Sequence, residues 1–305
     1  MIDLGKERII SSAVVSTAFG HSGGGMFPYI LFQSYRRLMR VAKETGTTVF
    51  TKSATIDERK GNFIPYDPRT WKYVQKIPGT SCGMINAYGL TNPGANVCAR
   101  KISAAAFRGR NIVPNFYPEF AKGTKQAIED ALEAVRNYRW LIMPADFWAI
   151  ELNFSCPNSE EDIKNNVEQG VQCVSAVRRE FPKLMIIAKI SFVHPYEFAQ
   201  GLESAGANVI HAINTIHHEI VFPGQKSPLP KGGGGISGDP AAELAFEYNK
   251  GLRKRTALPL IFGCGVRCIG DAHRYFDIGA DAVSMCSLAI RDPEEAEKIV
   301  REFNQ

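Results

Sequence analysis

The chain has 305 residues, of which 45% are hydrophobic and 22% are charged, and its formal net charge is +5 at pH 7. This length and composition allow a sizeable hydrophobic core and exclude a chain that is disordered over most of its length. The Lys and Arg residues are scattered and form no basic stripe interleaved with aromatic residues, so the sequence argues against nucleic-acid binding.

The cysteines and the N-terminal sequence indicate the compartment. The seven cysteines are odd in number and lack the paired spacing of a metal site, which predicts free thiols, a reducing compartment and no bound metal. The first residues, MIDLGKERII, contain no apolar signal-peptide core, and the most apolar stretch, Trp140 to Leu152, is interrupted by Asp146 and Glu151. We therefore expect a cytoplasmic protein that does not enter a membrane.

Short β-branched or apolar runs alternate with longer segments of helical periodicity, which is typical of a parallel sheet built from βα units. The eight predicted strands are Ala13–Ser16, Thr48–Ser53, Ile112–Phe116, Ala149–Phe154, Met185–Ser191, Asn208–Asn214, Leu258–Gly263 and Ala282–Ser287. The clearest predicted helices are Lys125–Tyr138, Val167–Glu180, Pro195–Ala205, Ala241–Lys254 and Pro293–Phe303. This order predicts an α/β fold, a (β/α)8 TIM barrel that forms one domain over residues 1–305.

Two long loops interrupt the barrel pattern. The chain between Ser53 and about Asn96 is rich in Gly, Pro, Asn and Lys and is too long for a simple turn. Loops of this length inside a compact domain are usually functional or disordered. We predict a functional excursion after the second strand, because it contains the compact run 86–90 (NAYGL), and we expect the Gly- and Pro-rich loop 216–238 to act as a lid.

Polar residues stand where several predicted strands end, namely Lys52, Asn115, Asn153, Lys189 and Asn214. A single Lys or Asn at such a position is ordinarily a solvated strand end, but the active site of a barrel lies where the C-terminal ends of all its strands meet. Asn supplies a donor and an acceptor, which suits a heterocycle whose edge alternates carbonyl and NH groups. Lys suits a substrate carboxylate or the negative charge near N1 and O2 of a reduced flavin.

Cys156 is the candidate base. Cysteine is often simply a buried, packed thiol, but Asn153 and Asn158 flank this one and Pro157 stiffens its loop just past the fourth strand. A thiolate opposite a flavin can remove a ring proton while the neighbouring hydride leaves to flavin N5.

Three glycine-containing turns indicate a phosphate site. The run 231–238 (KGGGGISG) precedes a helix that starts near Asp239, and the runs 262–266 (FGCGV) and 285–287 (MCS) end the last two strands. A glycine tract alone is often a flexible linker, but phosphate binding after the seventh and eighth strands is common in barrels. No GxGxxG spacing follows the first strand, so we do not expect NAD to bind this chain directly.

Seven motifs in one order show that the chain resembles the dihydroorotate dehydrogenases, specifically the soluble group with a cysteine base. They are NFSCPN at 153–158, TKS at 51–53, NAYGLTNPG at 86–94, the lysine of AKIS at 189, INT at 213–215, GGISG at 234–238 and FGCGV at 262–266.

The resemblance implies FMN as cofactor and oxidation of dihydroorotate to orotate in pyrimidine biosynthesis. It implies that Cys156 takes the C5 proton while hydride passes from C6 to flavin N5, and that Lys52 is a catalytic residue beside the substrate carboxylate. Implied substrate-binding residues are Asn86, Ala87, Tyr88, Gly89, Leu90, Asn153, Asn158, Asn214 and Thr215. Implied cofactor-binding residues are Ser16, Lys52, Ser53, Asn115, Asn153, Lys189, Ile213, Gly238, Cys264, Gly265, Cys286 and Ser287.

The resemblance also implies the partners. The membrane-bound group of this family has an N-terminal helical extension and a serine base, which this sequence lacks, so we do not expect a quinone partner. The runs NAYGLTNPG and GGISG resemble the type that works with a separate iron–sulfur flavoprotein and NAD, and this sequence contains no iron–sulfur cysteines of its own. The resemblance further implies a homodimer.

The sequence departs from the family pattern in several turns. It has Val15-Ser16-Thr17 where Ala-Ser-Gly is usual, Cys264-Gly265 where Gly-Gly is usual, and Cys286-Ser287 where Gly-Thr is usual. The added side chains are expected to crowd the FMN phosphate. Residues 159–162 (SEED) replace the usual glycine-containing loop after SCPN, which leaves the exact substrate open.

Three other functions remain as alternatives. A dihydrouracil or dihydrothymine dehydrogenase subunit has SCPH where this chain has SCPN, so Asn158 favours orotate chemistry. A tRNA dihydrouridine synthase has NxGCP and a helical RNA-binding domain, neither of which is present in the sequence. A catalytically inactive flavin-binding protein is suggested by the altered phosphate turns.

Overall fold

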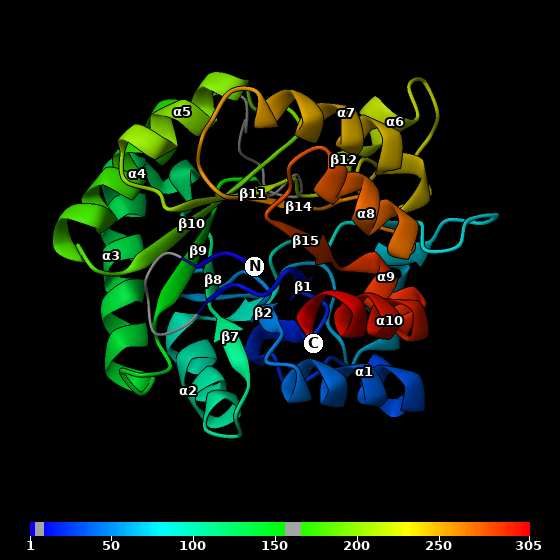
Figure 1. Cartoon of the computed structure of the whole chain (residues 1–305), viewed down its shortest axis with the longest axis horizontal. Helices are drawn as coiled ribbons and strands as arrows, with labels where there is room; N and C mark the ends of the chain where they lie inside the picture. The colour runs from blue at the N-terminus through cyan, green and yellow to red at the C-terminus, as the bar shows by residue number, and fades with distance from the viewer. Residues whose placement is uncertain (4–8, 156–165) are drawn as a thin grey trace.

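The computed structural model describes residues 1–3, 9–155 and 166–305. Its main sheet is parallel, and helices surround it (Figure 1). The order of the nine strands around the sheet is β7 (Asn111–Val113), β2 (Thr48–Phe50), β1 (Ala13–Ser16), β15 (Ala282–Met285), β14 (Leu260–Phe262), β11 (Val209–Ala212), β10 (Met185–Ile190), β9 (Ala149–Asn153) and β8 (Asn115–Phe116).

The two end strands of this sheet are consecutive pieces of one strand, separated only by Pro114. Proline has no amide N–H for the ladder and divides the strand. The first piece, β7, pairs with β2, and the second piece, β8, pairs with β9. The strand ring is thereby nearly closed, and all eight predicted strand positions and the TIM-barrel fold are confirmed.

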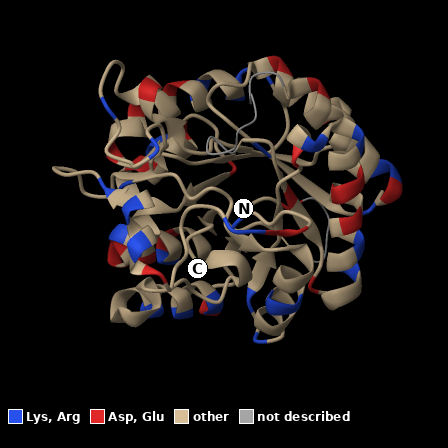
Figure 2. Ribbon diagram, turned by 180° about the vertical axis from the view of Figure 1, so that it is seen from behind, with Lys and Arg blue, Asp and Glu red and all other residues tan. Residues whose placement is uncertain are grey.

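Helices follow the strands and cover the outside of the barrel (Figure 1). They are α1 (Gln33–Glu44), α2 (Ala95–Ala106), α3 (Thr124–Leu141), α4 (Val167–Glu180), α5 (Tyr196–Ser204), α6 (His218–Val221), α7 (Ala242–Arg253), α8 (Ile269–Asp277), α9 (Ser287–Arg291) and α10 (Pro293–Asn304). The five predicted helices are present within three residues of their expected ends. No described helix has both the length and the apolar composition needed to cross a bilayer. Figure 2 shows charges of both signs spread over the outer helices.

The inward-facing residues of the strands form two layers. Toward the N-terminal ends the layer is apolar and includes Val14, Phe50, Ile187 and Val209, all buried. Two residues further along β10 and β11 the inward positions become polar, because side chains of a strand alternate between its two faces. The apolar layer therefore closes the bottom of the barrel, and the polar layer faces its C-terminal mouth.

The two long loops join into a second sheet that lies over the mouth. Its order is β12 (Ile216–His217), β13 (Gly235–Ser237), β5 (Met84–Asn86) and β4 (Val74–Lys76), all antiparallel. A further pair, β3 (Glu58–Arg59) with β6 (Asn92–Pro93), braces the base of the excursion. We call the four-stranded sheet the roof, because its residues Met84, Asn86 and Ser237 line the cleft beneath it.

Candidate active site

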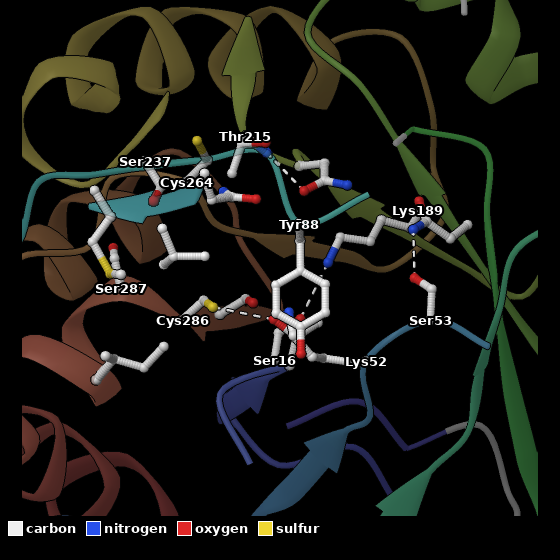
Figure 3. Close-up of a pocket in the computed structure, with 18 of the residues that line it drawn as sticks. Ser16, Lys52, Ser53, Tyr88, Lys189, Thr215, Ser237, Cys264, Cys286 and Ser287 are labelled. Carbon is white, nitrogen blue, oxygen red and sulfur yellow. Dashed lines mark hydrogen bonds between the residues drawn. The ribbon is translucent and has the colours of Figure 1, made fainter. Parts of the chain in front are cut away.

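A cleft lies between the C-terminal ends of the barrel strands and the roof (Figure 3). Its volume, including the part open to solvent, is about 1260 Å³. A site of this size is ample for a cofactor together with a small substrate. Its position is the one at which barrels carry their active sites.

Most of the site residues predicted from the sequence meet in this cleft. The lining includes Ser16, Lys52, Ser53, Asn86, Tyr88, Leu90, Asn153, Lys189, Ile213, Asn214, Thr215, Cys264, Gly265, Cys286 and Ser287. Four predicted residues are not in the lining, namely Ala87, Gly89, Asn115 and Gly238. Cys156 and Asn158 lie outside the described residues.

Two lysines enter the cleft from different strands. Lys52 follows β2, and its Nζ lies 3.8 Å from the centroid of the Tyr88 ring, which is a cation–π contact (Figure 3). Lys189 is the fifth residue of β10, is 6% exposed, and donates a hydrogen bond of 3.1 Å from Nζ to Ser16 Oγ. The cleft therefore holds one ammonium group near the roof and a second one deep in the barrel mouth.

A hydrogen-bond network fixes the amides at the ends of β9 and β11. The side chain of Asn153 donates to Ser53 Oγ (2.8 Å) and accepts from the backbone N and Oγ of Ser155 (3.0 and 2.6 Å). Asn214 Nδ2 donates to the carbonyl and Oγ of Ser155, both at 3.2 Å, and Asn214 Oδ1 accepts from Thr215 N at 2.8 Å. Ser155 thereby connects the two asparagines and holds their orientation beside the cleft.

Glu151 belongs to the polar inward layer of the barrel and was not singled out from the sequence. It is fully buried in β9, accepts hydrogen bonds from Asn115 Nδ2 and His211 Nδ1, and has Lys189 nearby. Burial alone would raise its pKa, but the charge of Lys189 and these hydrogen bonds hold the pKa below its usual range. Glu151 is therefore an anion in the polar layer, balanced by the Lys189 ammonium.

The end of the cleft near β14 and β15 carries the departures from the family pattern. Thr17 and Cys264 have left-handed φ angles of 63°, a conformation that favours glycine. Thr17 Oγ1 and Cys286 Sγ lie 3.1 Å apart, and burial raises the pKa of Cys264 to about 12, so this cysteine is a neutral thiol. The side chains of Thr17, Cys264 and Cys286 all line the cleft, where glycines would leave more space.

Several lining residues were not predicted from the sequence. They are His21, Met26, Tyr29, Phe63, Val74, Met84, Thr91, His211, Ser284 and Ile290. Thr17, Ser237 and Val266 also line the cleft, and they lie in the turns that the sequence associates with the phosphate. Most of the residues that were not predicted are apolar or lie in loops, where a single sequence gives no directional signal. Glu151 and His211 did carry a signal, because each is an ionisable residue inside an otherwise apolar strand.

Comparison with known proteins identifies the family. A sequence model of the family described as dihydroorotate dehydrogenase matches residues 33–305. The chain is 27% identical over 265 residues to the dihydroorotate dehydrogenase B (NAD(+)) catalytic subunit of Oceanobacillus iheyensis, covering 84% of this chain and 79% of that protein. The subunit of the same name from Parabacteroides distasonis is 26% identical over 298 residues, which cover 95% of this chain and 88% of that protein. The subunit of the same name from Halalkalibacterium halodurans is 29% identical over 263 residues, which cover 83% of this chain and 78% of that protein.

The family match covers every strand of the barrel except β1. It also covers all the cleft residues except Ser16, Thr17, His21, Met26 and Tyr29. The chain belongs to the dihydroorotate dehydrogenase family, whose members are oxidoreductases that act on a CH–CH group.

Proposed function

We propose that this protein uses FMN to oxidise dihydroorotate to orotate in pyrimidine biosynthesis. The observation that carries the proposal is the joint presence in one cleft of two lysines from different strands and three asparagines, Asn86, Asn153 and Asn214. Such a set supplies cations for an anionic substrate and cofactor, and amides for a ring edged by carbonyl and NH groups. The matched family supports the same reaction.

The described residues fit a bound flavin. Lys189 presents a buried ammonium group at the floor of the cleft, suited to the N1 and O2 edge of the ring. His211 also lines the cleft, and within the described part of the chain its Nε2 atom lacks a hydrogen-bond partner, which a polar ring edge would provide. When bound, FMN would supply the hydride acceptor at N5. At the other end, Ser237 and Ser287 line the cleft where the phosphate is expected.

Lys52 and the asparagines are assigned to the substrate. The Lys52 ammonium would pair with the carboxylate that distinguishes dihydroorotate from dihydrouracil. Asn153 and Asn214, held by Ser155, would meet the carbonyl and NH groups of the pyrimidine ring without losing much side-chain freedom on binding. The Tyr88 ring would cover this end of the cleft from the roof side.

Cys156 is assigned the role of the base that takes a proton from the substrate. In the sequence it follows Ser155 directly, and Ser155 is tied to both asparagines. A cysteine at this point in the chain would take the C5 proton of the substrate while the C6 hydride departs.

Electron transfer from the reduced flavin to NAD is assigned to a separate chain. The relatives are named catalytic subunits of NAD(+)-dependent enzymes, which supports an iron–sulfur flavoprotein partner that passes electrons to NAD. A cytoplasmic location and a homodimer of the barrel belong to the same proposal.

The substitution Cys156→Ser tests the proposed base. We expect the variant to keep its yellow FMN and to lose at least about 100-fold in the rate of flavin reduction by dihydroorotate, since a serine hydroxyl is a much weaker acid than a thiol. Stopped-flow absorbance under anaerobic conditions measures this rate. An unchanged rate would remove Cys156 as the base.

A further inference from the structure

Four buried polar side chains share the inward layer beneath the cleft. Asn115 comes from β8, Glu151 from β9, Lys189 from β10 and His211 from β11, and their exposed fractions are 0%, 0%, 6% and 0%. The inward residues below them, Ile187 in β10 and Val209 in β11, belong to the apolar layer. Two members of the polar layer, Lys189 and His211, line the cleft, whereas Asn115 and Glu151 do not.

Glu151 fixes the orientation of two of its neighbours. One carboxylate oxygen accepts from Asn115 Nδ2 and the other from His211 Nδ1. Burial, together with the charge of Lys189, lowers the pKa of His211, so the imidazole is neutral. A neutral imidazole carries one proton, and the anionic Glu151 requires it on Nδ1. Nε2 is then a bare acceptor.

This acceptor is unpaired, and the residue that carries it lines the cleft. Within the described part of the chain, His211 Nε2 is buried without a hydrogen-bond partner, and His211 is one of the lining residues. A buried acceptor without a partner destabilises the protein. The Phe50 ring lies 5.3 Å from the His211 ring, so an apolar side chain at position 211 would have an apolar neighbour and would carry no such atom. The arrangement points to a ligand that brings an N–H group.

We propose that His211 contacts the cofactor ring through Nε2, accepting a hydrogen bond from a ring N–H, and that Glu151 is the positioning residue that fixes the required tautomer. This inference rests on the proposed function, because it takes the ligand to be FMN. The oxidised flavin ring has a single N–H, at N3, next to the O2 atom that the proposed function assigns to Lys189. His211 and Lys189 stand on adjacent strands and interact electrostatically.

The experiment measures FMN binding and the ionisation of the flavin N3–H. Apoprotein is titrated with FMN, and the visible spectrum of the bound flavin is then followed to alkaline pH. For His211→Phe we expect the dissociation constant for FMN to rise on the order of tenfold. We also expect the bound N3–H to ionise at lower pH, because it has lost its acceptor. His211→Gln keeps a hydrogen-bond acceptor, so we expect its affinity for FMN and the pH at which the bound N3–H ionises to stay close to those of the unmutated protein.

His218→Phe is the matched control. His218 is another buried histidine beside a phenylalanine, Phe222, but it does not line the cleft, so we expect both measurements to stay at the unmutated values. If His211→Phe does not fold, His211→Leu carries the same comparison with a smaller apolar side chain. Equal FMN affinity and an unmoved N3–H ionisation in the apolar variant would overturn the role of His211. Failure of the unmutated protein to bind FMN would instead overturn the proposed function.

Discussion

The contact between Lys52 and Tyr88 bears on substrate choice. The Lys52 Nζ atom lies over the Tyr88 ring at 3.8 Å, and both residues line the cleft (Figure 3). Holding the ammonium against an aromatic face keeps it in one place, and an ammonium group is suited to a carboxylate. Under the proposed function, we therefore expect Lys52 to discriminate between dihydroorotate and uncharged dihydropyrimidines.

Lys52→Ala tests this discrimination. Removing a charge-assisted contact is expected to cost about 1.5–3 kcal/mol for the substrate that carries the carboxylate, so kcat/KM for dihydroorotate falls roughly 10- to 150-fold. The affinity for dihydrouracil, which has no carboxylate, is expected to change much less. Flavin reduction by dihydroorotate and its inhibition by dihydrouracil give the comparison, and equal losses of affinity for the two compounds would contradict the assignment of Lys52 to the carboxylate.

His21 is expected to make the stability of the protein depend on pH. It lies in the short 3-10 helix η1 (Gly20–Ser22) and lines the cleft, and burial together with the charge of Lys52 lowers its pKa to about 3. The unfolded chain, with a histidine pKa of about 6.5, binds the proton more readily than the folded one. The stabilisation from a neutral His21 is thus complete above about pH 6.5 and is lost as the pH falls toward 3.

His21→Gln removes this contribution. We expect the free energy of unfolding of the variant to fall less steeply than that of the unmutated protein between about pH 6.5 and pH 4. Urea unfolding at a series of pH values measures both slopes, and all other titrating groups are common to the two proteins. Parallel slopes would show that His21 is not held neutral by the fold.

At the residue scale, the sequence predicted the polar side chains at the strand ends, because the barrel topology places every strand end at one mouth. It did not predict the His211–Glu151 pair. A single ionisable residue in an apolar strand does not reveal which partner another strand brings to it. The four predicted residues outside the lining show the same limit, since Gly238, for example, packs against Cys82 and not into the cleft.

At the scale of elements, Gly238 connects the roof to the barrel. It follows β13 with φ 77° and ψ −144°, a region that is essentially restricted to glycine. A Cβ atom there would lie 2.4 Å from the carbonyl oxygen of Cys82 in the excursion. The next residue, Asp239, accepts hydrogen bonds from Ser81 Oγ and Cys82 N, both at 2.8 Å, so the excursion is held closely against this turn.

Gly238→Ala is expected to be destabilising by at least about 2 kcal/mol, from backbone strain together with the clash against Cys82. Gly224→Ala is the control, because Gly224 also has a positive φ, 72°, but a Cβ atom there meets nothing within 4 Å. Urea unfolding gives the two values, and hydrogen exchange shows whether residues 81–86 lose protection. Equal destabilisation of the two variants would mean that the Cys82 contact is unimportant.

The roof itself was not predicted as a sheet. The sequence indicated two long functional loops, but β5 and β13 have only three residues each. They pair across about 150 positions of sequence, and the hydrogen bond from Asn86 Nδ2 to the Gly235 carbonyl, for example, joins residues 149 positions apart. Strands this short carry no periodic signal. The barrel strands were predictable because runs of β-branched residues recur with helices between them.

At the scale of the whole molecule, the nearly closed barrel brings together residues from position 16 to position 290 in one cleft. The central claim is that this cleft oxidises dihydroorotate with FMN. The most direct measurement is anaerobic: the purified, FMN-loaded protein is mixed in turn with dihydroorotate, dihydrouracil and dihydrothymine, and the flavin absorbance is followed. The account predicts bleaching by dihydroorotate alone. A flavin that dihydroorotate leaves oxidised, or that dihydrouracil bleaches equally well, would contradict it.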